Sequence, residues 1–255
     1  MIDVCIAGIT GWVGAPLAEA VAEADDLRLV AGVARRGAGT MVVGAPVHAT
    51  LADALATPFD VLVDYTSADA AKDHAIEAAA AGRHVVIGSS GLTNDDYAEI
   101  DTAARANGTG VLAVGNFAIT AALLDRFAVL AAEHLPSWEI LDIASDGKID
   151  APSGMARQLA WRLAQVRKPE TRIPVDQTVG EIATRGADID GSRIHSMRLP
   201  GYTIGLEVRF GLADERLTIS YDGGTGAGPY VAGTLLAIRR VGGLVGVFRG
   251  LDAVI

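Results

Sequence analysis

The stretch DVCIAGITGWVG, residues 3–14, decides the fold of this 255-residue chain. It begins as a short, β-rich apolar run and continues with Gly8, Gly11 and Gly14, spaced G-x-x-G-x-x-G. A helical pattern follows, and LRLVAGV at residues 27–33 predicts a second strand. A strand, a glycine-rich turn, a helix and a strand in this order are the context of a dinucleotide-binding fingerprint, although two residues rather than one separate the first two glycines. The alternative is a strand-to-helix turn that is tight but binds nothing.

The end of the second predicted strand indicates which nucleotide is preferred. The sequence there is GVARRG, so Ala34 stands where NAD-preferring sites place an acid for the ribose, and Arg35 and Arg36 follow. Guanidinium groups pair well with phosphate, which favours NADPH, with NADH as the second possibility. The alternative is a pair of arginines that is simply solvated.

Three further strand patterns, at residues 59–66, 84–91 and 109–117, alternate with helical patterns at 70–82 and 96–108. Open α/β sheets bind ligands at the carboxyl ends of their strands. We therefore expect the polar and glycine-rich strand ends to form one rim, which comprises Asp64, Tyr65, Thr66, Gly88, Ser89, Ser90, Gly115, Asn116 and Phe117.

The second half of the chain has a different pattern. A helix at residues 152–166 has Ser153 as a plausible N-cap and an apolar face made of Ala156, Leu159, Ala160 and Leu163. Strands without intervening helices follow it, which predicts a second, mixed sheet.

We therefore predict an α/β fold with two domains. Residues 1–118 and roughly 235–255 form a Rossmann-like, parallel-sheet nucleotide domain, and residues 119–234 form an α+β domain for substrate binding and oligomerisation.

Composition narrows the class of protein. The net charge is −10 and the basic residues form no long run, which argues against nucleic acid as a partner. No uncharged apolar run approaches the roughly 18–20 residues that span a membrane, and the first residues lack a signal-peptide pattern. Cys5, the single cysteine, reads as a buried structural thiol, and no Cys/His cluster has metal-ligand spacing. We expect a cytoplasmic protein with a small-molecule substrate and no metal.

Several motifs agree at this point. GITGWVG, VDYTS, VIGSSGLT, GNFAI, GKIDAPSGMA and GLVGVFRGLD occur in the order found in 4-hydroxy-tetrahydrodipicolinate (dihydrodipicolinate) reductases of lysine biosynthesis, and the chain resembles that family over nearly its whole length. The resemblance implies a Rossmann-like domain, a smaller mixed-sheet domain and a homotetramer. It also implies reduction of a cyclic dicarboxylate with a C=N bond by NADH or NADPH.

The resemblance also implies site residues. Lys148 matches the family's active-site lysine, and Ser153 and Gly154 match a turn that donates hydrogen bonds to a substrate carboxylate. The implied cofactor contacts are Gly8, Thr10, Gly11, Trp12, Val13, Gly14, Arg35, Gly88, Ser89, Ser90, Val114, Gly115, Asn116 and Phe117.

The chain departs from the family pattern at positions expected to carry out catalysis and to bind the substrate. Ala144 and Ser145 replace a histidine pair, Met155 replaces a threonine, and the basic residue expected after ISYD is absent. Trp12 stands in place of a basic residue and is expected either to stack on the cofactor or to pack against a neighbouring helix.

Three assignments on the substrate side stay open. Lys148 donates a proton, binds a carboxylate as a point charge, or is simply a surface lysine. Asp146 is either a substitute acid or a solvated loop carboxylate, and His195 is either a replacement polar group for the substrate or an ordinary sheet residue. Ser145 and Met155 are expected to bind the substrate, and Ala144 and Met155 are expected to make its pocket more apolar than the family's.

The resulting hypothesis is an NADPH-dependent reductase of a C=N bond in a small cyclic imine, acting through Lys148 and Asp146. The alternatives are the lysine-pathway reaction itself, a reaction on another small molecule such as a C=O or 2-amino compound, and a non-catalytic NADP(H)-binding protein.

Overall fold

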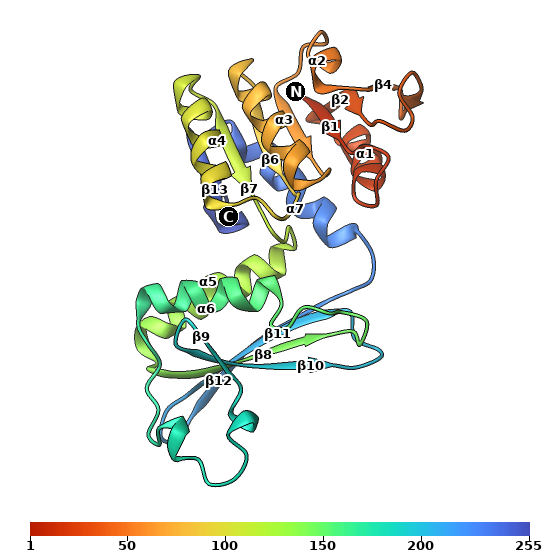
Figure 1. Cartoon of the computed structure of the whole chain (residues 1–255). Helices are drawn as coiled ribbons and strands as arrows, with labels where there is room; N and C mark the ends of the chain where they lie inside the picture. Colours follow the sequence, from red (N-terminus) through yellow and green to blue (C-terminus); the bar gives the residue numbers. More distant parts are fainter. The chain divides into compact units, whose positions relative to one another are not determined.

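The computed structural model describes the whole chain, residues 1–255, as two compact units (Figure 1). The first unit comprises Met1–Ile119 and Gly226–Ile255, and the second comprises Thr120–Thr225. The boundary that the sequence suggested near residue 235 lies inside helix α7 (Gly228–Val241). All of α7 belongs to the first unit, so the chain returns to that unit at Gly226, about nine residues earlier than expected.

The first unit is built on an eight-stranded sheet with the order β13-β7-β6-β5-β1-β2-β4-β3. Its strand pairs are parallel except for the short antiparallel β3–β4 pair, which confirms the Rossmann-like class. The strands are β1 (Ile2–Ala7), β2 (Leu27–Val33), β3 (Met41–Val42), β4 (Ala45–His48), β5 (Val61–Asp64), β6 (His84–Ile87), β7 (Gly110–Ala113) and β13 (Gly246–Arg249).

Helices cover both faces of this sheet. They are α1 (Gly14–Glu23), α2 (Leu51–Ala54), α3 (Ala68–Ala80), α4 (Asn94–Ala106) and α7. Helices α3 and α4 lie side by side on one face, and α1 packs with α7 on the other (Figure 1). Because both faces are covered, the central strands β5, β6 and β7 are almost wholly buried and apolar. None of the chain's helices combines the length and the hydrophobicity needed to cross a membrane.

The second unit contains a five-stranded mixed sheet with the order β12-β11-β8-β10-β9. Strands β8 and β10 are parallel and the other pairs are antiparallel. The strands are β8 (Ser137–Ala144), β9 (Ala187–Ile189), β10 (Ser192–Arg198), β11 (Ile204–Gly211) and β12 (Arg216–Gly223). Helices α5 (Ile119–His134) and α6 (Gly154–Val166) lie together along one face of this sheet (Figure 1).

The two faces of the second sheet differ in burial. In β8 every second residue is fully buried, namely Trp138, Ile140, Asp142 and Ala144, and these face the helices. The predicted apolar face of α6, Ala156, Leu159, Ala160 and Leu163, is fully buried, and Ser153 caps the helix as expected. Asp142 is thus a carboxylate on an otherwise apolar face, and it needs partners there.

Candidate active site

The glycine-rich turn between β1 and α1 brings backbone against backbone. Gly8 has a positive φ of 80°, and a Cβ at this position would lie 2.4 Å from the carbonyl oxygen of Tyr65. A Cβ on Gly14 would lie 2.1 Å from the carbonyl oxygen of Gly8, while the Gly11 N–H donates to that same oxygen at 2.8 Å. No larger residue fits at Gly8 or Gly14 without moving the main chain.

The N-terminus of α1 has the properties of an anion site. No side chain caps it and no acid lies in its first turn, whereas Thr93 caps α4 and Ser153 caps α6. The first N–H groups of a helix have no carbonyl partners within the helix, and the helix dipole favours negative charge there. The turn and this helix end therefore fit the pyrophosphate of a dinucleotide.

Trp12 lies in this turn with 62% of its surface exposed. Its ring meets Tyr230 of α7 edge-on, with 5.6 Å between centroids and an interplanar angle of 64°. Packing against a neighbouring helix, one of the two expected roles, is therefore present, and the exposed part of the indole is left for other contacts.

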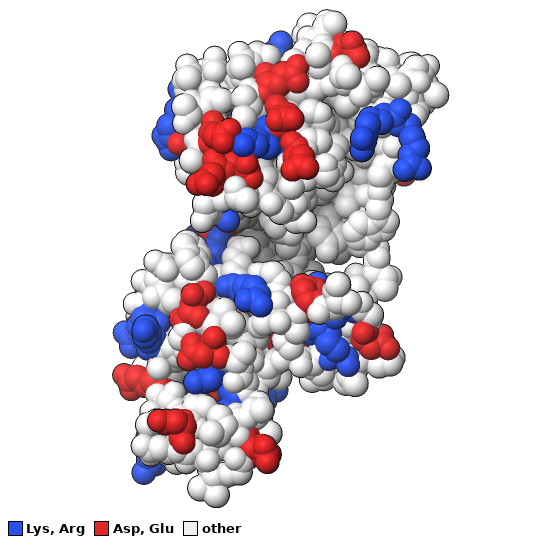
Figure 2. Space-filling model, viewed as in Figure 1, with Lys and Arg blue, Asp and Glu red and all other residues white.

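The arginine pair lies at the same edge of the sheet as the glycine-rich turn. Arg35 and Arg36 follow β2, both are exposed, and neither forms an ion pair within the chain. Basic side chains gather on this part of the unit in Figure 2, whereas acidic ones predominate over α3 and α4. A Cβ built on Gly37 would lie 3.5 Å from the methyl group of Thr10, so the structure brings the two predicted cofactor segments together.

The turn after β6 is held by a hydrogen bond to a buried carboxylate. The Ser89 hydroxyl donates to Asp64 Oδ1 at 2.9 Å, so it points into the protein, while Ser90 is exposed. Gly88 accommodates the Tyr65 ring, since a Cβ there would lie 2.1 Å from that ring. Ser90 and the main chain of this turn are what it offers to a ligand.

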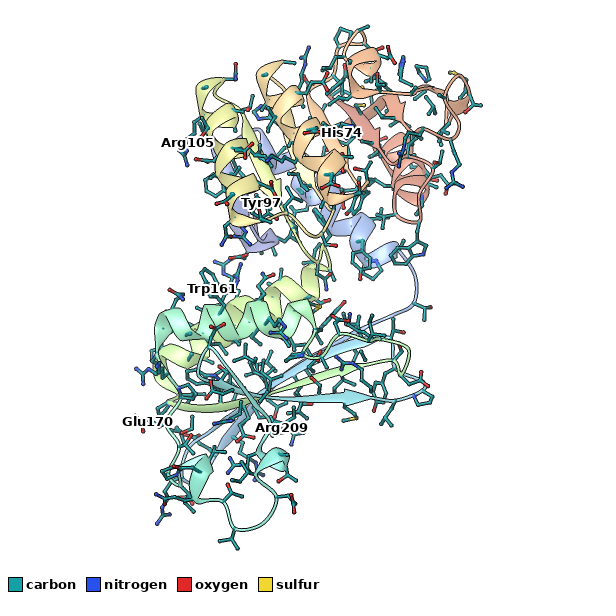
Figure 3. All side chains as sticks on the ribbon, viewed as in Figure 1. His74, Tyr97, Arg105, Trp161, Glu170 and Arg209 are labelled. Carbon is teal, nitrogen blue, oxygen red and sulfur yellow. The ribbon has the colours of Figure 1, made fainter.

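The expectation that Asp64 lines the rim is wrong, because its side chain is fully buried. It accepts hydrogen bonds from the N–H and hydroxyl of Thr66 and from Ser89, and it pairs with Nδ1 of His74 at 2.7 Å. His74, on α3 (Figure 3), thereby helps to hold the strand ends. Asp64 supports the rim from beneath rather than meeting a ligand.

The residues after β7 are mostly structural. Val114 and Phe117 are buried, and the Phe117 ring lies 5.8 Å from that of Tyr65. Asn116 Oδ1 accepts a hydrogen bond from the Ala118 N–H. Within this predicted cofactor segment only Gly115 is exposed.

In the second unit, Lys148 lies in the loop between β8 and α6. Its ammonium group is 2.7 Å from Asp150 Oδ1 and holds the pKa of that carboxyl below its ordinary value. Ser145, half-buried, accepts the Lys148 N–H at its carbonyl oxygen. Asp146 is exposed and has no hydrogen-bond or ion-pair partner within the chain, which is the behaviour of a solvated carboxylate.

The Pro-Ser-Gly turn offers fewer donors than the sequence suggested. The Ser153 N–H donates to Asp142 Oδ2 at 2.9 Å, and the Ser153 Oγ accepts from the Ala156 N–H. The Ser153 N–H is therefore taken, and the Ser153 side chain is buried with its hydroxyl directed to Asp142 as well. Gly154 is exposed at the first position of α6, where an N–H has no partner in the helix, and Met155 follows it half-buried.

Two residues that the sequence analysis missed complete this region. Asp142 accepts from Arg198 Nη2 at 2.7 Å and from the Ser196 hydroxyl at 2.9 Å, in addition to Ser153. Burial alone would raise the pKa of Asp142, but these donors together hold it below its ordinary value. An acid on the apolar side of an alternating strand is the sequence signal for such a buried pair.

His195 does not join this region. It lies on β10 between Ile194 and Ser196, and its Nε2 is 2.8 Å from Glu139 on β8, which also pairs with Arg185. Glu139 and its register partner Arg209 belong to the sheet face that α5 and α6 leave uncovered, as Figure 3 shows for Arg209. The structure therefore places His195 on the opposite face from Asp142 and Ser153. No group of three or more His, Cys, Asp or Glu side chains in the chain could hold a metal ion.

Comparison with known proteins gives one family for both units. The family model described as dihydrodipicolinate reductase, N-terminus, matches residues 2–117, and the corresponding C-terminus model matches residues 118–254. The 4-hydroxy-tetrahydrodipicolinate reductase of Halalkalibacterium halodurans is 36% identical over the whole of both chains. That of Lactococcus lactis is 33% identical over 94% of this chain and 92% of its own.

Solved structures agree with these relatives. The dipicolinate-bound dihydrodipicolinate reductase from Paenisporosarcina sp. TG-14 superposes with a TM-score of 0.89 and 28% identity, and the match covers all of both chains. An amine dehydrogenase from Mycobacterium smegmatis shares only the fold, with a TM-score of 0.67 and 14% identity over 98% of this chain and 95% of its own. The chain therefore belongs to the dihydrodipicolinate reductase family, whose members are NAD(P)H-dependent oxidoreductases that act on a C=N bond.

Proposed function

We propose that this chain reduces the C=N bond of a small cyclic imine that carries one carboxylate, with NADPH as its preferred reductant. The observation that carries the proposal is the selective change around the Pro-Ser-Gly turn. Lys148, Ser153 and Gly154 are present, while a fully buried Ala144 and a half-buried Met155 stand where the family has an imidazole and a hydroxyl.

The nucleotide would be held by the first unit. The uncapped N-terminus of α1 and the close-packed glycine-rich turn suit the pyrophosphate. Arg35 and Arg36, exposed and without ion-pair partners, suit a 2′-phosphate. When bound, NADPH supplies the hydride for the reduction.

The substrate carboxylate would be held by the second unit. The exposed Gly154 N–H can donate to it, and the Lys148 ammonium group adds a positive charge. Asp150 already offsets part of that charge at 2.7 Å, so the loop suits one carboxylate better than two. Ala144 is fully buried and adds no surface to the site, whereas the half-buried Met155 adds apolar surface, which favours a substrate that is less polar than a dicarboxylate.

Protonation of the imine nitrogen is the step that the missing imidazole affects. A cyclic imine that binds as an iminium ion has taken its proton from solution, so a positioned acid is less necessary. Loss of a general acid costs about 10²–10⁴-fold in rate when protonation does limit the reaction. The Lys148 ammonium group is the remaining proton donor in the loop, and Asp146, which is exposed to solvent, is the weaker candidate.

A second candidate function is the lysine-pathway reaction itself. It is favoured by curated relatives that are 33–38% identical, among them those of H. halodurans, L. lactis and Streptococcus pneumoniae, which bear the name 4-hydroxy-tetrahydrodipicolinate reductase. In that case Lys148 and solvent would replace the imidazole, and the pocket would accept both carboxylates.

The test is NADPH oxidation by the purified protein, measured by the loss of NADPH absorbance. The panel contains five- and six-membered cyclic imines with no carboxylate, with one carboxylate, and the lysine-pathway dicarboxylate, with a Lys148→Met variant as control. A higher kcat/KM for the monocarboxylates, lost in the variant, supports the proposal. A higher value for the dicarboxylate supports the second candidate, and NADPH binding without oxidation across the panel would refute both.

A further inference from the structure

We infer that the buried Asp142–Arg198 pair positions the turn that binds the substrate carboxylate; this inference rests on the proposed role of that turn. Asp142 lies near the end of β8, the central strand of the second sheet, and its side chain is fully buried. One of its oxygens, Oδ2, accepts from Ser153 N–H at 2.9 Å and from Arg198 Nη2 at 2.7 Å. The carboxylate therefore joins the ion pair directly to the main chain of the turn.

Arg198 holds the other end of the same turn. Its Nη2 also donates to the carbonyl oxygen of Asp150 at 2.6 Å, and its Nη1 donates to the main-chain oxygen of Asp142 at 3.1 Å. The segment from Asp150 to Ser153 is thus fixed at its start by the arginine and at its end by the aspartate. This bridge needs a planar group with several donors, which a lysine cannot supply.

The contacts determine which groups of the turn point outward. Because the Ser153 N–H is bound to Asp142 and the Ser153 side chain is buried, the exposed Gly154 N–H is what the turn presents to a ligand. A turn that is already in the binding conformation loses less conformational entropy when the carboxylate arrives. Asp142 and Arg198 are therefore positioning residues.

The inference predicts an effect on carboxylate binding that leaves nucleotide binding unchanged. The variants are Arg198→Lys, Asp142→Asn and Asp142→Ala. Asp142 Oδ1 is buried without a hydrogen-bond partner, so an asparagine amide can take its place while the other oxygen still accepts all three hydrogen bonds. The matched control is Arg185→Lys, which alters an ion pair with Glu139 on the opposite face of the same strand.

Three quantities are measured for each variant. They are hydrogen exchange of the peptide that spans residues 148–156, the Kd for pyridine-2-carboxylate and pyridine-2,6-dicarboxylate, and the Kd for NADPH. We expect Arg198→Lys to exchange faster and to bind the better probe about tenfold more weakly, the loss of one hydrogen bond to a charged group. Asp142→Ala should also exchange faster and bind the probe more weakly, whereas Asp142→Asn should keep both properties close to those of the wild type. The Kd for NADPH should not change in any variant.

Several results would overturn the inference. One is unchanged exchange in Arg198→Lys, and another is faster exchange with unchanged probe affinity. Equal effects from Arg185→Lys would show a general loss of stability instead. A wild-type protein that binds neither probe would also overturn it, whereas one that binds a probe but reduces no imine refutes the proposed function and leaves the positioning role standing.

Discussion

Replacement of Arg35 and Arg36 by serine is expected to weaken NADPH binding strongly and NADH binding hardly at all. Both side chains are exposed and neither pairs with a carboxylate, so their removal should change the free energy of unfolding by no more than about 0.5 kcal/mol. A hydrogen bond to a charged group contributes about 1.5–3 kcal/mol. Since about 1.4 kcal/mol is a factor of ten, each arginine that contacts the 2′-phosphate should raise the Kd for NADPH by about 10- to 150-fold.

Fluorescence titration of both nucleotides at low and high salt measures this difference. The contribution of an exposed arginine should shrink as salt screens it, so wild type and the double variant should converge at high ionic strength for NADPH only. Arg105→Ser is the control for net charge, because Arg105 lies on α4 and pairs with Asp101. Equal loss of affinity for NADH and NADPH would refute the assignment, as would no loss for either.

Three further outcomes are expected. Gly88→Ala should destabilise the first unit by about 1–3 kcal/mol, because its Cβ would lie 2.1 Å from the Tyr65 ring; an unchanged thermal midpoint would contradict this packing of Tyr65 on Gly88. Leu159→Ala, at a fully buried position of α6, should lower the free energy of unfolding by about 2–5 kcal/mol in denaturant titrations, and a loss below about 1 kcal/mol would not fit. The hydrogen bond from Lys72, together with the hydrogen bonds from Thr93 at the N-cap of α4, lowers the pKa of the Asp96 carboxyl from 3.8 to about 2. Its stabilising effect is thus present above pH 3.8 and is lost as the pH falls to about 2, so the thermal midpoints of wild type and Asp96→Asn should differ at pH 5 and converge at pH 2.

The fold could be predicted well because short-range sequence patterns, such as glycine spacing and apolar periodicity, determine where these strands, turns and helices form. The glycine spacing at residues 8–14 reports the close backbone approach that the structure shows at Gly8 and Gly14. The spacing of the apolar residues in α6 predicted its buried face correctly, because one face of a helix comprises residues that recur every three or four positions. The return of the chain to the first unit was placed about nine residues too late, inside α7, although the glycine-rich stretch GGTGA at residues 223–227 directly precedes that helix.

The site was less predictable because its contacts are far apart in sequence. The pair of His195 with Glu139 spans 56 residues, and that of Arg198 with Asp142 also spans 56. The strand period could have indicated that His195 faces away from the helices, since Ile194 beside it is buried. It could not indicate that Asp142 would accept a hydrogen bond from the Ser153 N–H, because this contact depends on how the turn is placed against the end of the strand.

The buried pair also bears on whether the substrate region is in use. Taking two charges out of water costs free energy that their attraction repays only partly, so apolar residues of similar volume often stabilise a fold as well or better. Fold stability alone therefore explains Asp142 and Arg198 poorly. Both hold the main chain of one turn, and that turn leads to the exposed Gly154 and follows Lys148. A pair that contributes little to stability but fixes the geometry of a ligand-binding turn is expected where binding still matters, which favours a site that is in use over one that has lost its function.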